Sequence, residues 1–170
     1  MSMIGYIYLL RPEELEAALE DPPRVHDLIA RACDVDAETD CFVDLDKTWH
    51  CLHFLLTGTA WDGEAPLDFI ATGGIEIGEE DLGYGPARGF RAKEVAAIAS
   101  ALEPVSGGDL VARFDGARMD ELEIYPSGGW RDVDAADPEQ LGYLAGAFDE
   151  ARMLCLRGRN RGLAMIVWVS

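Results

Sequence analysis

The most apolar segments of the chain lie near its two ends. Residues 3–10 (MIGYIYLL) and 163–169 (LAMIVWV) are nearly continuous hydrophobic runs, rich in β-branched and aromatic residues. Strands that are buried on both faces have this pattern, because neither side of such a strand meets water. Neither run has a hairpin partner nearby in the sequence. We therefore expect the two runs to pair with each other in a central sheet.

Between these runs, apolar residues recur mostly at helical spacing. The clearest helix start is Asp137-Pro138, which combines an aspartate cap with proline at the first helical position, and this helix should end at Gly158 or Gly162. Residues 92–102 (AKEVAAIASAL) predict a strongly amphipathic helix. The same spacing predicts further helices at 12–20, 25–32, 47–57, 66–72, 109–114 and 118–122, and a short strand at 75–77.

The order of these elements indicates the fold class. Helices and strands do not alternate regularly, so the pattern favours an α+β fold over a doubly wound α/β fold. A length of 170 residues suits one domain. We expect a single domain over residues 1–170, mostly helical, around a small sheet that contains both terminal strands. The acidic segment 34–46 (DVDAETDCFVDLD) is interpreted as a solvated connector.

Charge restricts the partners of the protein. The chain has 32 acidic and 14 basic residues, a net charge of −18, and residues 1–85 carry −15 of it. Such a balance disfavours nucleic acid. The acidity either confers solubility alone, which is the favoured interpretation, or complements a basic protein partner. One basic cluster, Arg152, Arg157, Arg159 and Arg161, is either a phosphate patch or a set of cations at a helix C-terminus.

Several classes of protein are disfavoured by what the sequence lacks. No apolar run reaches the roughly 18 residues of a membrane span, and residues 3–10 lack the features of a signal peptide. Four irregularly spaced cysteines do not form a disulfide framework, so we expect a reducing, cytoplasmic location. The chain has no GxSxG, HExxH or CxxC motif and no Walker loop. We expect no cofactor, no metal and no membrane association.

The helix expected at 47–57 (KTWHCLHFLLT) carries an unusual set of polar groups among leucines. Lys47, His50, His53 and Thr57 recur at helical spacing, beside Trp49. An HxxH pair binds metal when carboxylates join it. The alternative is that one histidine is a hydrogen-bonded, half-buried core residue and the other lies on the surface, and this alternative is favoured.

A glycine-rich loop is the second candidate region. Residues 81–88 (DLGYGPAR) present Tyr84 and Arg88, and Arg88 suits an anion or a carboxylate ligand. The alternative is a rigid turn that leads into the next strand. We expect this loop and the 47–57 helix to meet at one cleft, with Tyr84 and Tyr125 as its apolar wall. The candidate cleft residues are therefore Lys47, Trp49, His53, Thr57, Tyr84, Arg88 and Tyr125.

Four short motifs together resemble the YfbM-like family, a bacterial domain of unknown function. They are MIGY at 3–6, DK-x-W-x-x-LHFLLTG at 46–58, GYGPAR at 83–88 and EIYP at 123–126. The resemblance covers essentially the whole chain and implies a single α+β domain without an established catalytic residue. His50 lies outside the family pattern, which favours His53 alone over a two-histidine metal site. Residues 89–92 (GFRA) replace the Tyr-Leu-Thr-Pro of the family, so the helix that follows loses its usual cap.

Three functional hypotheses follow from these observations. The first is a small soluble protein with a ligand cleft near the 47–57 helix and the 83–88 loop. The second is an acidic interaction module, such as an immunity protein that neutralises a toxin. The third is an enzyme with an unrecognised site of His, Lys and Arg. The partner would be a small molecule in the first hypothesis and a basic protein in the second.

Overall fold

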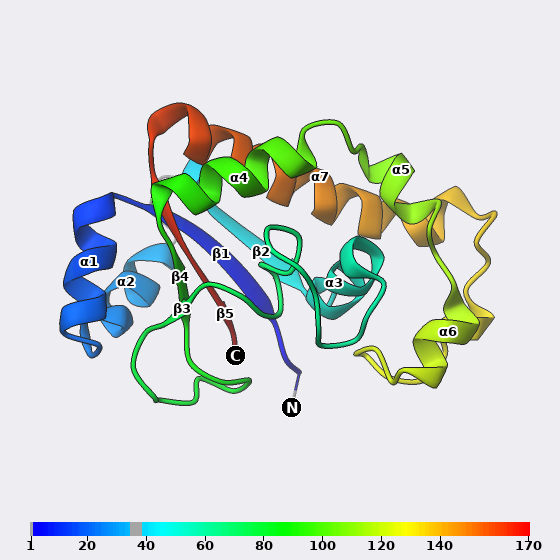
Figure 1. Ribbon diagram of the computed structural model, residues 1–170. Coiled ribbons are helices and arrows are strands. Elements are labelled where there is room, and N and C mark those ends of the chain that lie inside the picture. The colour runs from blue at the N-terminus through cyan, green and yellow to red at the C-terminus, as the bar shows by residue number, and fades with distance from the viewer. Residues whose placement is uncertain (1, 35–38) are drawn as a thin grey trace.

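A five-stranded antiparallel sheet organises the protein (Figure 1). The computed structural model describes residues 2–34 and 39–170. In these residues the strands lie in the order β2-β1-β5-β4-β3. Their bounds are β1 (Gly5–Leu10), β2 (Phe42–Asp46), β3 (Ile75–Glu76), β4 (Arg88–Phe90) and β5 (Ala164–Val169).

The two terminal strands are neighbours, as the sequence predicts. β1 and β5 pair antiparallel over six residue pairs, from Gly5 opposite Val169 to Leu10 opposite Ala164. All six residues of β5 are buried, and so are five of the six in β1. A central strand with both faces covered requires an apolar residue at every position, which explains why neither run alternates with polar residues.

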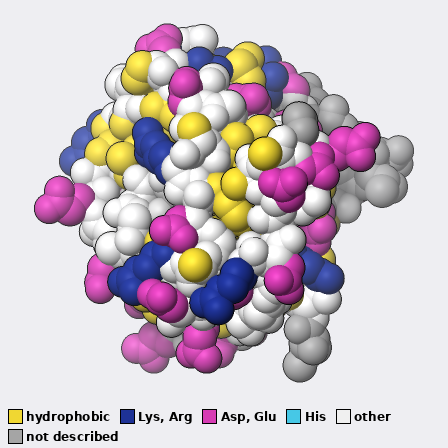
Figure 2. Space-filling view, turned by 90° about the vertical axis from the view of Figure 1, so that its right-hand side faces the viewer, with side chains coloured by type: hydrophobic (Ala, Val, Ile, Leu, Met, Phe, Trp, Pro, Cys, Tyr) yellow, Lys and Arg dark blue, Asp and Glu magenta, His cyan; other side chains and the backbone are white. Residues whose placement is uncertain are grey.

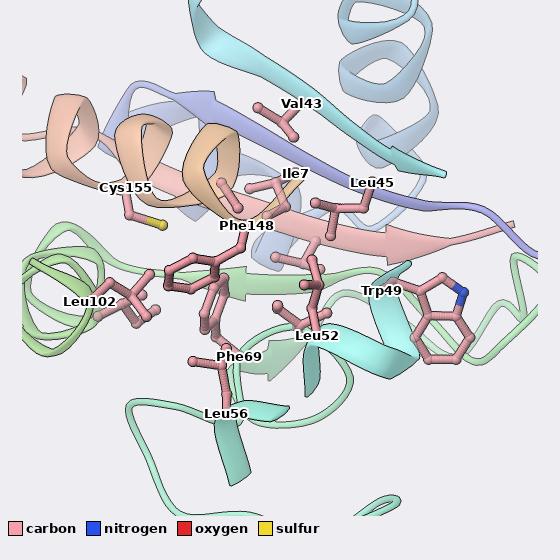
Figure 3. Packing of buried hydrophobic residues seen from close by; sticks show 14 of the residues in the cluster. Ile7, Val43, Leu45, Trp49, Leu52, Leu56, Phe69, Leu102, Phe148 and Cys155 are labelled. Carbon is pink, nitrogen blue, oxygen red and sulfur yellow. The ribbon is translucent and has the colours of Figure 1, made fainter. Parts of the chain in front are cut away.

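Helices cover both faces of the sheet (Figure 1). Successive side chains of a strand point to opposite faces. Ile7 and Leu9 of β1 accordingly pack into the larger core under α3, α4 and α7, whereas Tyr8 and Leu10 pack against α1 and α2. Figure 3 shows the larger core, in which Phe148 of α7 lies among residues from the sheet and the other helices. The helices are α1 (Pro12–Glu20), α2 (Arg24–Ala32), α3 (Trp49–Thr57), α4 (Ala92–Leu102), α5 (Gly107–Val111), α6 (Gly116–Glu121) and α7 (Pro138–Arg161).

The longest helix, α7, begins and ends as its sequence predicts. The side chain of Asp137 accepts a hydrogen bond from the backbone N–H of Glu139, and Gly162 ends the helix in the left-handed conformation at φ 64°. At the start of α4 the carboxylate of Glu94 accepts the backbone N–H of the N-cap residue Arg91 at 2.8 Å, so one backbone donor of the helix start is satisfied.

Two expectations about local structure are wrong. The 34–46 segment is not a connector throughout, because residues 42–46 form the edge strand β2, paired with β1; residues 35–38 lie outside the described residues. Val43 and Leu45 are buried between exposed or half-buried positions, which is the alternation of a half-buried strand. Residues 66–72 form hydrogen-bonded turns instead of a helix.

The arginines of α7 pair within the molecule. Arg152 donates to the carbonyl oxygen atoms of Leu102 and Glu103 at the end of α4. Arg159 forms an ion pair with the side chain of Glu103, at 2.8 Å. Arg157 and Arg161 interact with Asp40. This cluster therefore attaches α7 to neighbouring elements and is not an open phosphate patch.

None of the described helices is long and apolar enough to cross a membrane.

Deletion of residues 163–170 should abolish folding. The deletion removes β5, the strand that lies between β1 and β4. The backbone groups of β1 and β4 that pair with β5 would then have no hydrogen-bond partners. Far-UV circular dichroism and thermal melting of the truncated chain test this prediction. A cooperative melt with a native spectrum would contradict it.

Candidate functional site

An aromatic cluster lies at the end of the sheet where β1 starts and β5 ends. Trp49, the first residue of α3, is 1% exposed and lies at its centre. Its ring centroid is 5.0 Å from that of His50, 5.5 Å from Tyr84 and 6.0 Å from both Trp61 and Tyr125. Contacts of this kind stabilise aromatic pairs beyond the area they bury. The cluster thus joins α3 to three loops.

Two members of this cluster are open to solvent. The rings of Trp61 and Tyr84 stack nearly parallel, with centroids 4.9 Å apart and an interplanar angle of 10°. Trp61 is 39% exposed and Tyr84 is 47% exposed. The ring of Trp61 also lies 4.2 Å from that of His50, which is fully buried. We call Trp61 and Tyr84 the aromatic pair.

His50 holds the loops of the cluster in place through both ring nitrogens. Its Nδ1 accepts the backbone N–H of Tyr125 at 2.9 Å, so Nε2 carries the proton and donates to the carbonyl of Ala60 at 2.7 Å. Burial lowers the pKa of His50. The imidazole is therefore neutral, and both nitrogens are occupied by backbone groups. His50 positions Trp61 and Tyr125 and is not available to a metal.

The chain segment before β1 closes the cluster from another side. Trp49 donates its indole N–H to the carbonyl of Met3 at 3.2 Å, and the hydroxyl oxygen of Tyr125 accepts the N–H of Met3 at 3.0 Å. Gly5 allows this close approach, because a Cβ atom at this position would lie 2.5 Å from the Cβ of Trp49. The glycine of the MIGY motif is thus required by the packing of Trp49.

The loop that carries Tyr84 is held by hydrogen bonds between its own residues. The carboxylate of Asp81 accepts the N–H groups of Gly83 and Gly85, at 2.8 and 2.9 Å, and these bonds lower the pKa of Asp81. Gly83 has φ 138° and lies against Ser170, so only glycine fits there. The loop presents Tyr84 in one defined position.

His53 lies one turn further along α3, fully buried. Its Nε2 donates to the carbonyl of Asp62 at 3.1 Å, while Nδ1 has no hydrogen-bond partner among the described residues. Burial lowers the pKa of His53 to about 4. Next to it, the Thr57 hydroxyl donates to the carbonyl of His53 at 2.8 Å. No hydrogen bond joins either side chain to the 83–88 loop in the described structure.

Arg88 serves the backbone of the turn before β3. Its guanidinium donates to the carbonyls of Phe69, Ile70 and Gly73, at 3.1, 2.7 and 3.2 Å, and also to that of Thr72. Burial lowers its pKa to about 10, which leaves the group charged at neutral pH. The anion site expected at Arg88 remains a prediction, but its observed bonds are to carbonyl oxygens. These bonds explain why residues 66–72 need no helix to satisfy their carbonyls.

The structure brings together three of the seven predicted site residues. Trp49, Tyr84 and Tyr125 share the aromatic cluster, whereas His53, Thr57 and Arg88 make the separate contacts given above and Lys47 is exposed. Sequence reasoning missed Trp61 altogether and set His50 aside. A tryptophan within the polar segment 57–64 (TGTAWDGE) was the available signal, because no apolar periodicity explains it.

Residues 1–168 match the family described as Domain of unknown function (DUF1877). The chain belongs to the DUF1877 family. Protein YfbM from Escherichia coli (strain K12) is 31% identical over 135 residues, which span 74% of each chain. The crystal structure of YfbM from Escherichia coli, described as a protein of unknown function, matches with a TM-score of 0.68 and 26% identity. That match covers 98% of this chain and 99% of that chain.

Membership of DUF1877 confirms the expected family and the α+β fold, but the family description assigns no activity. The site must therefore be argued from its own residues. Within residues 2–34 and 39–170, no group of three or more His, Cys, Asp or Glu side chains is arranged to hold a metal ion. Burial raises the pKa of the Cys51 thiol, so a nucleophilic thiolate is disfavoured at neutral pH. What this DUF1877 chain does expose is aromatic surface.

The buried His53 should make the stability of the protein depend on pH. The unfolded chain binds a proton at His53 near pH 6.5, whereas the folded chain binds it only near pH 4. Between these values the unfolded state holds more protons, so the free energy of unfolding falls as pH falls. The loss attributable to His53 should approach about 3 kcal/mol at pH 4 and should be absent above pH 7.

Urea unfolding at pH 7.5 and pH 5 measures this effect. His53→Gln, whose amide can still donate to the Asp62 carbonyl, should lose clearly less stability between the two pH values than the native chain. His26→Gln, the same substitution at an exposed position, is the control. An identical pH dependence in the native chain and His53→Gln would show that His53 is not held neutral by the fold.

Arg88→Lys should destabilise the protein even though it keeps the charge. A single ammonium group cannot reach four carbonyls that the planar guanidinium spans. Hydrogen bonds from charged groups contribute ~1.5–3 kcal/mol each, so we expect a loss of about 2 kcal/mol or more in urea unfolding. Arg118→Lys, at an exposed pair with Glu121, should change stability by less than ~1 kcal/mol. Equal effects of the two substitutions would leave the Arg88 guanidinium free for another role.

Proposed function

We propose that this protein binds another protein through the aromatic pair, Trp61 and Tyr84. The observation that carries the proposal is that two large stacked rings are exposed on a rigid base. Tryptophan and tyrosine are enriched among the residues that dominate binding energy at protein interfaces. Trp61 lies in the loop that follows α3, and Tyr84 lies in the 83–88 loop.

The rigidity of the aromatic pair supports a binding role. Trp61 packs on the buried His50, and Tyr84 contacts the buried Trp49 and sits on a loop held by Asp81. Side chains already fixed in one position lose little conformational entropy when a partner arrives. The two rings therefore offer contact area at low entropic cost.

The shape of the surface favours a protein over a small molecule. The most distinct hollows of the molecule are lined by other residues, and small ligands are usually enclosed. A small ligand is the second candidate. It is favoured by a hollow of about 450 Å³ along the segment that carries Trp61, lined by Leu56, Thr57, Thr59, Asp62, Gly63, Glu64 and Leu67.

Site-specific photocrosslinking tests the proposed interface. A benzophenone amino acid replaces Trp61 or Tyr84 in the organism that encodes the protein, and cells are irradiated. We expect a discrete heavier adduct from both positions, because both rings would lie against the partner. The same label at Tyr143, which is 58% exposed on α7, is the control and should give no such adduct.

Two results would count against the proposal. One is that neither position 61 nor position 84 gives an adduct while the labelled proteins are folded. The other is that the adducts from 61, 84 and 143 are the same, which indicates collision without a defined interface. Native mass spectrometry of the freshly purified protein addresses the second candidate, since a retained small molecule would favour the hollow.

A further inference from the structure

We propose that the group seated on the aromatic pair is an arginine side chain of the partner protein. This inference rests on the proposed function and adds the chemistry of the contact. Three observations support it. The segments that bear the two rings are acidic, most of their acids form no ion pair among the described residues, and an arginine–tyrosine contact exists elsewhere in the same chain.

The aromatic pair lies within a stretch of sequence whose charged residues are all acidic. Residues 59–86, which include Trp61 and Tyr84, contain seven Asp or Glu residues and no Lys or Arg. Lys47 is the single basic residue between Arg31 and Arg88. On the face that carries α5 and α6, by contrast, basic and acidic side chains are interspersed (Figure 2). The field around the aromatic pair therefore attracts cations.

Most of the acids in this stretch have no cationic partner within the described structure. Glu80 pairs with His26 at 2.8 Å. The negative charges of Asp68 and Glu76 act on the buried Arg88, where they oppose the lowering of its pKa by burial. The remaining acids are all exposed and form no ion pair among the described residues; they are Asp62, Glu64, Glu79 and Asp81. Asp62 adjoins Trp61, and Asp81 holds the loop of Tyr84.

Arginine is the cation that fits both features at once. The faces of aromatic rings carry partial negative charge and attract cations within about 6 Å of the centroid. A guanidinium stacks flat on such a ring and still offers N–H groups at its edge to a carboxylate, whereas a lysine ammonium is a strongly hydrated point charge. An aromatic pair with exposed carboxylates on its own loops matches the guanidinium.

A related contact of an arginine with a tyrosine and a carboxylate exists elsewhere in this protein. The guanidinium carbon of Arg31 lies 5.6 Å from the centre of the Tyr8 ring, and its Nη1 donates to the Glu14 carboxylate at 2.7 Å. Its Nε donates to the hydroxyl of Tyr8 at 2.9 Å. At the aromatic pair, Tyr84 provides a ring, and Asp62 and Asp81, on the loops that carry the pair, provide carboxylates without an arginine. The partner would supply it.

A pair of synthetic peptides tests this inference. One is a blocked glycine-rich heptapeptide with three arginines, and the other carries citrulline at the same positions, which keeps the shape and removes the charge. Two-dimensional NMR of the folded protein follows the Trp61 indole N–H and the amides of residues 81–85. The arginine peptide should shift these signals, and the citrulline peptide should bind at least tenfold more weakly.

Variants separate the local contact from general attraction to an acidic protein. Tyr84→Leu retains apolar bulk and removes the ring, so it should lower the affinity for the arginine peptide about fivefold. Asp62→Asn should lower this affinity by a similar factor. Glu139→Gln, at an exposed acid on α7, and Tyr143→Leu should leave the affinity unchanged. Thermal melts verify that each variant is folded. Raising the salt from 0.1 M to 1 M shortens screening from about 10 Å to about 3 Å and should abolish most of the binding.

The outcomes distinguish this inference from the proposed function. If both peptides bind equally, or if Tyr84→Leu and Glu139→Gln behave alike, no arginine is read by the aromatic pair and the inference is overturned. The photocrosslinked adducts at positions 61 and 84 would still stand in that case. If positions 61 and 84 give no photocrosslinked adduct, the proposed function itself is overturned, whichever peptide binds.

Discussion

Strands β1 and β5 come from opposite ends of the chain, and their six residue pairs form the middle of the sheet. Every other element is placed relative to this ladder. The edge strand β2 pairs with β1, and β4 pairs with β5. Because side chains alternate between faces, the two strands also divide the apolar residues into two cores, one under α1 and α2 and one under α3, α4 and α7.

The same pairing creates the site. Antiparallel strands bring the start of β1 and the end of β5 to one edge of the sheet, so Met3, Gly5 and Ser170 meet there. Trp49 packs on this edge because Gly5 has no side chain, and the loop of Tyr84 lies against Ser170 because Gly83 has none. The exposed rings are therefore placed against the central ladder of the sheet. A surface built in this way differs from a mobile loop tip, where an exposed tryptophan would be free to fold back onto the protein.

Local patterns predicted those parts of the structure whose cause is local. The terminal strands, α4 and α7 follow from apolar periodicity and from the cap at Asp137. β2 was missed because the acids at 44 and 46 outweigh Val43 and Leu45 in a strand that is buried on one face only. Trp61 was missed because its contacts, His50 and Tyr84, are distant in sequence. The hydrogen bonds of Arg88 were not predicted because a sequence cannot show that the carbonyls of Phe69, Ile70, Thr72 and Gly73 converge on its guanidinium.

The buried and the exposed members of the site differ in what they leave unused. Both nitrogens of His50 are bonded to backbone groups, and the hydroxyl of Tyr125 accepts the N–H of Met3, so these side chains are fully explained by the fold. Trp61 and Tyr84 cover Trp49 and still leave large parts of their rings exposed. Asp62 and Asp81, on the loops that carry these rings, form no ion pair among the described residues. The fold accounts for the position of the aromatic pair, and the proposed partner would account for its exposed rings and unpaired carboxylates.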